Sequence, residues 1–385
     1  MQKQQINNKS ILIVVGFIPF SAIFGGAIDV WERIKGLHHL GYNIDLIVTD
    51  KVEPTKQQLD EIGNYVNQFY FVKRQNKIWQ LAGNLPLQYL SRLGLQNIII
   101  DNSYDLLILE SEFCWAITKN KTVKYNKLVV RVHNIESYYF KMLGKSSKSI
   151  KEKVYYKIES VKIKNLSKMV FNQADRLWFI SKDDILVVNQ PNKSVFMPLP
   201  INDDFVQPKS KSTNNVVFMG SLFMQNNTFG LDWYLQKVHP FLIDKIPNYH
   251  FYIIGSLKEE NQYIKQKYSH LKNVTLVINA KCLKQYYENS VLFVNPMFHG
   301  SGVKVKSVNA LANGLPLVST SVGVEGIGLS NDMYYHAETE NDFLNQIISI
   351  LENQEIALQK TTRAQLYLQE NNYLNVLKKE LDVLI

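Results

Sequence analysis

The chain has 385 residues, which is more than one hydrophobic core usually organises, so two domains are expected. Hydrophobic residues make up 46% and charged residues 20%, which excludes a disordered chain, and no run reaches the roughly 20 apolar residues of a membrane-spanning helix. The formal net charge is +9, and the two cysteines, Cys114 and Cys282, have neither metal-ligand nor disulfide spacing, which indicates a reducing compartment.

Two interpretations fit the first segment of the chain. Lys9 precedes an apolar run, Ile11 to Phe24, that resembles the core of a signal peptide. A buried strand over 11–15 followed by a loop with Gly25 and Gly26 is favoured, because an amphipathic helix follows directly. We therefore expect a soluble, cytoplasmic protein.

The first half of the chain alternates short β-branched runs with helical patterns. This alternation predicts a parallel sheet covered by helices on both faces. The expected strands lie at 11–15, 44–48, 69–72, 105–109, 127–132 and 176–180.

A lysine-rich segment interrupts this alternation. Between Lys141 and Lys168 there are nine lysines and only two acids, Glu152 and Glu159, with apolar residues interleaved. Such a segment suits an anionic membrane surface, and a peripheral position on the inner face of the cytoplasmic membrane would follow. The other interpretation is a solvated helix. No base-reading motif is present, so nucleic acid is not an expected partner.

A polar, turn-rich stretch over 200–215 suits an interdomain linker, after which the pattern restarts. Strands are expected at 216–219, 251–254, 274–278, 291–294 and 317–319, and the chain is helical from Asp342 to its end. The fold class is therefore α/β, with two doubly wound, Rossmann-like domains at 1–205 and 206–365 that face a cleft. The segment 366–385 is expected to form a C-terminal helix that packs back on the first domain. Ligands of such sheets bind at the carboxyl ends of the strands.

One stretch of the second half carries a phosphate-site pattern. A strand at 291–294 leads to the loop Gly300-Ser301-Gly302, and a helical pattern runs from Val303 to a C-cap at Asn313-Gly314. Backbone N–H groups at the start of that helix suit a phosphate, and Lys304 and Lys306 add positive charge. An ordinary strand-to-helix turn with two solvated lysines is the alternative.

Several segments in the same order resemble bacterial glycosyltransferases of the family 4 type, the glycosyl transferases group 1, which have the GT-B architecture. They cover nearly the whole chain. The matching segments are Arg131 to Glu136, Ala174 to Asp184, Val217 to Leu222 with Asn226, Asn227, Trp233 and Pro240, His299 to Val318, and Val322 to Ile327.

The resemblance implies a nucleotide-diphosphate sugar as donor substrate, retention of anomeric configuration, and no metal or other cofactor. It implies catalytic roles for His133 and Lys306. The donor-binding residues it implies are Gly26, Gly220, Ser221, Ser301, Gly302, Val303, Lys304, Asn309 and Glu325, and the acceptor-binding residues are Gly25, Asn134 and Glu136. For His133 the other interpretation is a histidine that caps a strand end, and for Glu136 a structural role.

The chain departs from the family pattern at one important position. Many members carry two glutamates eight positions apart, and the second binds the ribose hydroxyls, whereas this chain has Ser301 and Asn309 there. An amide keeps one acceptor bond where a carboxylate offers two stronger ones, so weaker donor affinity is expected. The expected partners are the nucleotide sugar and a glycan or lipid-linked acceptor. The alternatives are an inactive homologue that serves as partner subunit of an active transferase, and a sugar-nucleotide epimerase on a similar scaffold.

Overall fold

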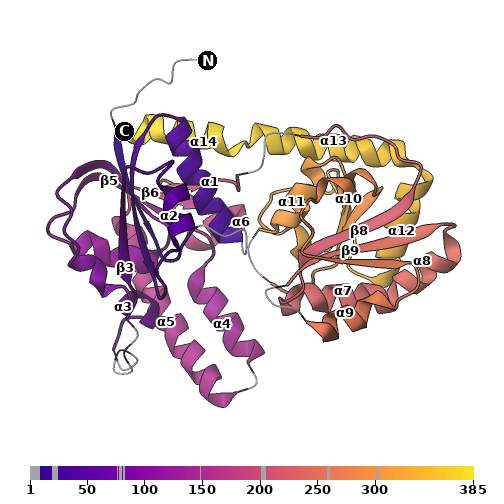
Figure 1. The fold of residues 1–385 in the computed structure, drawn as a ribbon, viewed down its shortest axis with the longest axis horizontal. Coiled ribbons are helices and arrows are strands. Elements are labelled where there is room, and N and C mark those ends of the chain that lie inside the picture. The colour runs from indigo at the N-terminus through magenta and orange to yellow at the C-terminus, as the bar shows by residue number, and fades with distance from the viewer. Residues whose placement is uncertain are drawn as a thin grey trace. The chain divides into compact units, whose positions relative to one another are not determined.

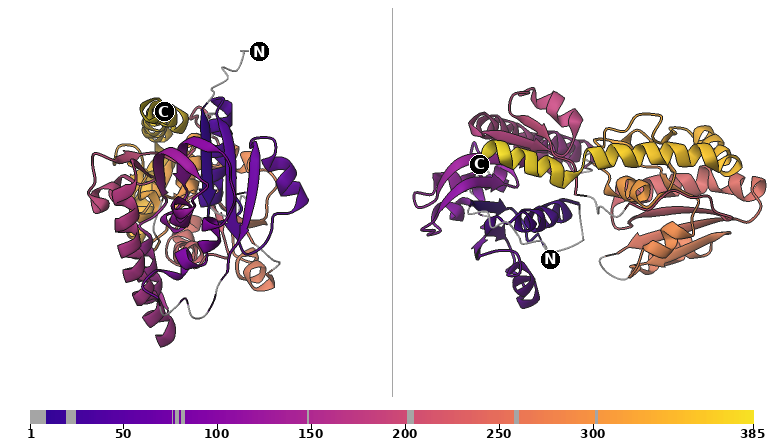
Figure 2. Two further views of the ribbon diagram at one scale, coloured as in Figure 1. Left: turned by 90° about the vertical axis from the view of Figure 1, so that its left-hand side faces the viewer. Right: turned by 90° about the horizontal axis from the view of Figure 1, so that it is seen from above.

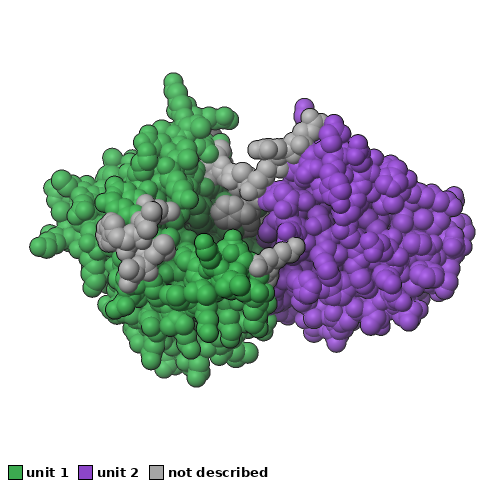
Figure 3. All heavy atoms as spheres, turned by 90° about the horizontal axis from the view of Figure 1, so that it is seen from below, with its two compact units in different colours: residues 1–200, 373–385 green, residues 201–372 purple. Residues whose placement is uncertain are grey.

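The protein is described by a computed structural model that covers residues 9–19, 25–75, 77, 80, 83–147, 149–200, 205–257, 261–300 and 303–385. It divides into two compact units (Figure 3). Unit 1 comprises residues 1–200 and 373–385, and unit 2 comprises residues 201–372. The junction thus lies at 200/201, whereas the sequence pattern placed it at 205/206. Phe205 packs against the core of unit 2.

Unit 1 is built on a sheet of seven parallel strands in the order β3-β2-β1-β4-β5-β6-β7 (Figure 1). The strands are β1 (Ser10–Val15), β2 (Asn43–Asp50), β3 (Gln68–Lys73), β4 (Ser103–Leu109), β5 (Lys124–Val132), β6 (Arg176–Phe179) and β7 (Ser194–Phe196). The order reverses between β1 and β4, so the doubly wound topology expected from the sequence is confirmed. Such a reversal is where open parallel sheets form their ligand sites.

Both faces of this sheet are buried, as its nearly continuous apolar strands require. In β1, Leu12 and Val14 enter the core on one face, while Ile11, Ile13 and Val15 enter the core on the other. The covering helices are α1 (Gly25–His39), α2 (Lys56–Ile62), α3 (Leu87–Leu90), α4 (Glu136–Ser146), α5 (Ile150–Gln173) and α6 (Lys182–Val188), with 3₁₀ helices η2 (Leu93–Gln96) and η3 (Glu112–Lys119).

The C-terminal helix α14 (Tyr373–Leu384) returns to unit 1, as the sequence predicted. Its residues Tyr373, Leu377 and Leu381 are buried in the same core as Val30 and Ile34 of α1. A Cβ on Gly36 would lie 2.9 Å from Cδ2 of Leu374, so α1 and α14 approach closely. Residues 366–372, which were expected to belong to the returning segment, lie in unit 2.

Unit 2 has a sheet of six parallel strands in the order β10-β9-β8-β11-β12-β13, which reverses between β8 and β11. The strands are β8 (Asn214–Ser221), β9 (Tyr249–Ser256), β10 (Val274–Ile278), β11 (Leu292–Asn295), β12 (Leu317–Ser319) and β13 (Tyr335–His336). The helices are α7 (Gln225–Lys237), α8 (His239–Lys245), α9 (Gln262–Ser269), α10 (Lys284–Glu288), α11 (Val305–Ala312), α12 (Glu340–Glu352) and α13 (Gln354–Glu370), with the 3₁₀ helix η4 (Val322–Val324).

Helices α4 and α5 form a hairpin that extends away from the sheet of unit 1 (Figures 1 and 2). The Ser160 hydroxyl donates a 2.7 Å hydrogen bond to the Ser137 carbonyl and joins the two helices. The lysine-rich segment of the sequence lies on this hairpin.

Candidate functional site

The predicted donor residues of unit 2 gather where β8 and β11 diverge. Gly220 and Ser221 end β8, and a Cβ on Gly220 would lie 3.3 Å from Nδ2 of Asn227 and 3.2 Å from the ring of Phe218. Glycine therefore lets the first turn of α7 come close to the end of the strand. Asn227 is buried, and its Nδ2 donates a 3.0 Å hydrogen bond to the Ser221 carbonyl.

Lys306 lies in the first turn of α11 and points to this strand end. Its Nζ donates a 2.7 Å hydrogen bond to Oδ1 of Asn227 and lies 4.8 Å from the centroid of the Phe218 ring. Among the residues that the structure describes, no carboxylate pairs with this ammonium. Burial, and then the neighbouring charge of Lys304, lower the pKa of Lys306 to about 7. A cation held in this way is electrostatically ready for an anion.

Lys304, the N-cap residue of α11, has a carboxylate partner instead. Its Nζ lies 3.3 Å from Oε2 of Glu325, the residue that follows η4. Burial lowers the pKa of Lys304, and the charge of Glu325 opposes that shift. The two predicted lysines therefore differ, because one is paired with an acid and the other with an amide.

A buried polar framework fixes α11 against η4. The Asn295 amide nitrogen donates hydrogen bonds to Ser307 Oγ at 2.8 Å and to the Gly323 carbonyl at 3.0 Å. The Ser307 hydroxyl donates to the same carbonyl at 2.7 Å. A Cβ on Gly323 would lie 2.1 Å from Ser319 Oγ, so only glycine fits there. The framework holds Lys304 and Glu325 on adjoining segments.

The remaining donor predictions fall on or near α11. The helix begins at Val305, two residues later than the sequence suggested. Val303 precedes the helix and packs against the hydrophobic core of unit 2. Asn309 is half-buried on α11, and the structure gives its side chain no hydrogen-bond partner among the described residues. Ser301 and Gly302 lie outside the described residues.

In unit 1 the predicted acceptor residues lie near the reversal between β1 and β4. Gly25 and Gly26 are the first residues of α1, so the glycine loop does open a helix. His133, Asn134 and Glu136 follow β5, and all three are partly exposed. Among the described residues, the donor predictions thus lie in unit 2 and the acceptor predictions in unit 1, except that Gly26, a donor prediction, lies in unit 1.

The imidazole of His133 faces two buried carboxylates. Its Nε2 lies 3.3 Å from Oε2 of Glu110, and its Nδ1 lies 3.6 Å from Oδ2 of Asp29. Both ring nitrogens therefore point into unit 1, and the side chain is 15% exposed. The ring is held in one orientation by groups that carry no motif in the sequence.

Two arginines neutralise those carboxylates. Arg131 binds both Asp29 oxygens at 2.9 Å, and Arg33 contacts Asp29, Glu110 and the Tyr373 hydroxyl. Burial works against ionisation of Asp29, but the charges of Arg131 and Arg33 outweigh it and lower the pKa of Asp29 to about 2. Burial works against ionisation of Glu110 too, but Arg33 and His133 together outweigh it and lower the pKa of Glu110. Asp29, Glu110 and His133 are close enough to surround a cation, but both acids are already paired, so they are not suited to bind a metal ion.

Glu136, the first residue of α4, has a different environment. Burial, and then the charge of Glu112, raise its pKa to about 8. Glu112 is itself buried, and Ser167 donates a 2.8 Å hydrogen bond to its Oε1. Glu136 is thus a partly exposed carboxyl group that holds its proton near neutral pH. Such a group can donate as well as accept a hydrogen bond.

The sequence does not single out Asp29, Glu110 or Glu112 in unit 1, and it gives Asn227 of unit 2 no role. Asp29 lies inside the helical pattern of α1, and Glu110 directly follows β4, so each looks like an ordinary polar residue. The only sequence signal for Glu110 and Glu112 is their position after a strand next to the reversal of the sheet order.

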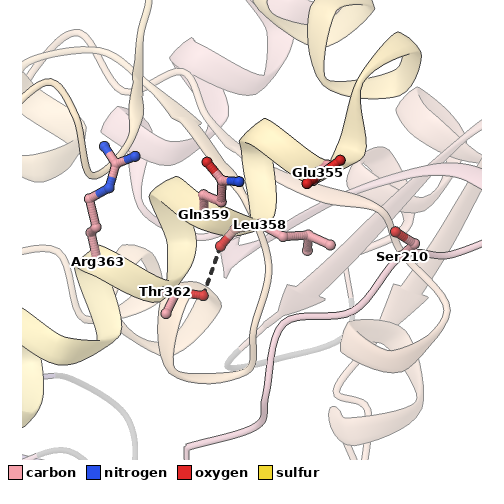
Figure 4. Close-up of a pocket in the computed structure, with 6 residues that line it drawn as sticks. All are labelled: Ser210, Glu355, Leu358, Gln359, Thr362 and Arg363. Atoms are coloured by element: carbon pink, nitrogen blue, oxygen red, sulfur yellow. Dashed lines mark hydrogen bonds between the residues drawn. The ribbon is translucent and has the colours of Figure 1, made fainter.

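A depression on the surface of unit 2 lies apart from these groups. It runs along α13 and is lined by Ser210, Glu355, Leu358, Gln359, Thr362 and Arg363 (Figure 4). It contains none of the predicted site residues. In the part of the chain that the structure describes, no helix is both long and apolar enough to span a bilayer.

Comparisons with known proteins place the chain among its relatives. The family model described as glycosyl transferases group 1 matches residues 213–353. An uncharacterized 44.6 kDa protein in the cps region of Klebsiella pneumoniae is 34% identical over 359 residues, which cover 89% of this chain and 91% of the relative.

Two solved structures share the fold along the whole chain. A mutant of S. aureus TarM in complex with Fondaparinux, alpha-GlcNAc-glycerol and UDP matches with a TM-score of 0.66 at 10% identity, covering 98% of this chain and 99% of that one. HepE of Anabaena in complex with UDP matches with a TM-score of 0.65 at 13% identity, covering 97% and 99%.

Proposed function

The chain belongs to the glycosyl transferases group 1 family and has the GT-B fold, and on this basis we propose that it moves a sugar from a nucleotide-diphosphate donor to a glycan, glycolipid or glycoprotein acceptor. We propose that the reaction retains the anomeric configuration and needs no metal or other cofactor. The product would enter a cell-surface polysaccharide or glycoconjugate, which is supported by the relative in a cps region.

The observation that carries this proposal is the ammonium of Lys306, which has an amide partner and no carboxylate among the described residues. The diphosphate leaving group gains negative charge as the glycosidic bond breaks. A fixed cation at the start of α11 stabilises that charge more in the transition state than in the ground state, and this difference accelerates the step. Gly220 and the Ser221 carbonyl lie beside Asn227, the partner of Lys306, and Val303 and Lys304 directly precede the helix that carries Lys306.

For the acceptor we propose the residues after β5 in unit 1. Glu136, with its raised pKa, can donate a hydrogen bond to a sugar hydroxyl while Asn134 accepts one. Glu110 holds the ring of His133 in one orientation, and we keep His133 as a proposed catalytic residue that acts at the edge of the acceptor site.

Ligand-induced melting shifts test the proposed donor. We expect at least one of the UDP-, GDP-, ADP- and dTDP-sugars to raise Tm by several degrees, because a ligand at about 100 times its Kd contributes ~2.7 kcal/mol to stability. Lys306→Met should abolish the shift. Lys360→Met is the matched control, because Lys360 is a half-buried lysine of unit 2 bound by backbone carbonyls. A wild-type protein that no nucleotide sugar stabilises at millimolar concentration would contradict the proposal.

Asn309 is the one observation that favours a second candidate, an inactive homologue that acts as partner subunit of an active transferase. Turnover of a nucleotide sugar by the wild-type protein alone would exclude it. Conversely, an Asn309→Glu variant that still binds no nucleotide would favour it.

We further propose that the α4–α5 hairpin contacts an anionic membrane surface. Ile150, Val154, Ile158 and Val161 are exposed and lie at spacings of four, four and three, so they share one face of α5. Exposed lysines flank this stripe at 151, 153, 157 and 164. An apolar stripe with flanking lysines suits the headgroup region of an anionic bilayer.

Vesicle flotation tests the membrane proposal. The wild-type protein should float with vesicles that contain anionic lipid and much less with neutral ones, and Ile158→Glu should reduce flotation. The matched control is Ile356→Glu, an equally exposed helix position in unit 2. Equal flotation with both lipid compositions, or no effect of Ile158→Glu, would refute the proposal.

A further inference from the structure

Lys306 is held in place by a neutral side chain, the amide of Asn227, which is buried and has a hydrogen-bond partner of its own. The Asn227 Nδ2 donates to the Ser221 carbonyl at 3.0 Å, so the amide oxygen is the atom left to face Lys306 Nζ at 2.7 Å. The backbone N–H of Asn227 donates to Oδ1 of Asn226 at 3.0 Å. Asn227 is 7% exposed, and the absence of a side chain at Gly220 leaves room for its amide.

This arrangement anchors the ammonium and leaves its charge uncompensated. A carboxylate at the same place would form an ion pair with Lys306, as Glu325 does with Lys304. The amide oxygen and the Phe218 ring orient the ammonium without neutralising it. Burial, and then the repulsive charge of Lys304 two residues earlier, lower the pKa of Lys306 to about 7.

We propose that Asn227 is a positioning residue of the donor site, whose amide oxygen fixes the Lys306 ammonium and leaves its charge to the diphosphate. This inference rests on the proposed function for the identity of its ligand, but the contact between Asn227 and Lys306 is present in the structure whatever the ligand is. The residue acts through Lys306, and its chemical identity matters because aspartate, which has nearly the same shape, would supply the missing counter-charge.

Competitive labelling of lysines by acetic anhydride, followed by mass spectrometry, tests the contact without any nucleotide. In Asn227→Asp the new carboxylate should raise the pKa of Lys306, so its labelling rate near neutral pH should fall by roughly tenfold or more. Asn226→Asp is the matched control, because it adds the same charge one residue away and leaves the Asn227 amide on Lys306. Labelling of Lys306 that is equal in wild type and Asn227→Asp would overturn the proposal.

Calorimetric titration with UDP reads the consequence for the donor. We expect Asn227→Asp to weaken UDP binding by roughly tenfold or more, because the ammonium is then compensated and a negative charge faces the diphosphate. UDP affinity equal to that of the wild type would overturn the positioning role. If neither protein binds UDP while Lys306 labelling still falls, the positioning role stands and the proposed donor site fails.

Asn227→Ala keeps the proposal testable if Asn227→Asp does not fold. That variant removes the anchor without adding charge, so UDP affinity should fall by a few-fold while Lys306 labelling does not decrease. Unchanged UDP affinity in Asn227→Ala would contradict a positioning role. Melting curves of all the variants verify that each is folded.

Discussion

The ammonium of Lys306 is hydrogen-bonded to the amide oxygen of Asn227 and lies over the Phe218 ring. Both groups are neutral, so neither compensates the positive charge of the lysine. In Lys306 the effect is visible as a pKa lowered to about 7, first by burial and then by Lys304. A bound diphosphate reverses the balance, since an anion favours the charged form of the ammonium. Donor binding and proton uptake at Lys306 are therefore coupled.

This coupling predicts a pH dependence. Above pH about 7 the free protein has lost the Lys306 proton and the complex has not, so UDP affinity should fall as pH rises to about 9, by at most tenfold per pH unit. Below pH about 7 both states are protonated and this contribution is constant. Calorimetry across that range measures it. In Lys306→Met the slope should vanish, and a slope that persists would show that another group titrates.

The amide of Asn309 also leads to a prediction about the affinity for UDP. A glutamate there offers two charged acceptor atoms to the ribose, and charged hydrogen bonds contribute about 1.5–3 kcal/mol against about 1 for neutral ones. Asn309→Glu should therefore tighten UDP binding by roughly three- to tenfold. Asn313→Glu, one turn later on the same stripe of the helix, is the control and should not. UDP affinity unchanged in Asn309→Glu would mean that position 309 does not face the ribose.

Among the elements of unit 1, α14 closes the charged cluster behind His133. Arg33 Nη1 donates a 3.1 Å hydrogen bond to the Tyr373 hydroxyl, and Glu380 on the same helix accepts a hydrogen bond from Trp178 Nε1 at 3.1 Å. The C-terminal helix thus completes both the core and the buried polar network of unit 1. Loss of either contact leaves a buried donor without a partner.

Tyr373→Phe tests this role of α14. The variant removes the acceptor of a buried guanidinium N–H and should lower the free energy of unfolding of unit 1 by about 1–3 kcal/mol. Urea denaturation measures the change. Tyr263→Phe alters an exposed tyrosine and should have no measurable effect. If both variants unfold at the wild-type midpoint, the Arg33–Tyr373 contact contributes nothing to stability.

Elements are predictable from the sequence where local pattern decides them. Most strands of both sheets are recognisable because buried parallel strands form short apolar runs, whereas the short edge strands β7 and β13 are not predicted from the sequence. Pro240 predicts a break after α7, and α7 does end at Lys237. A second helix, α8, nevertheless begins at His239, because the N–H groups of the first helical turn have no partner within the helix and a proline there removes no hydrogen bond. Asp29 and Glu110 are not predictable in this way, because their partners lie far away in the chain and no local signal encodes such pairing.

For the whole molecule, the order of motifs along the chain is sufficient to indicate the family and the two-domain fold. The motifs include both Lys306 and Asn227 but not the contact between them, because the two residues are 79 positions apart in the chain and meet only once unit 2 has folded. The sugar and the acceptor depend on side chains of loops whose shape no periodic pattern fixes.

Hydrogen exchange with and without UDP tests whether the donor diphosphate binds where β8 meets α11. The largest protection should fall on two segments of unit 2, Gly220 to Asn227 and Val303 to Asn309, and it should be lost in Lys306→Met. Protection confined to other segments, or none at saturating UDP, would contradict this placement of the donor.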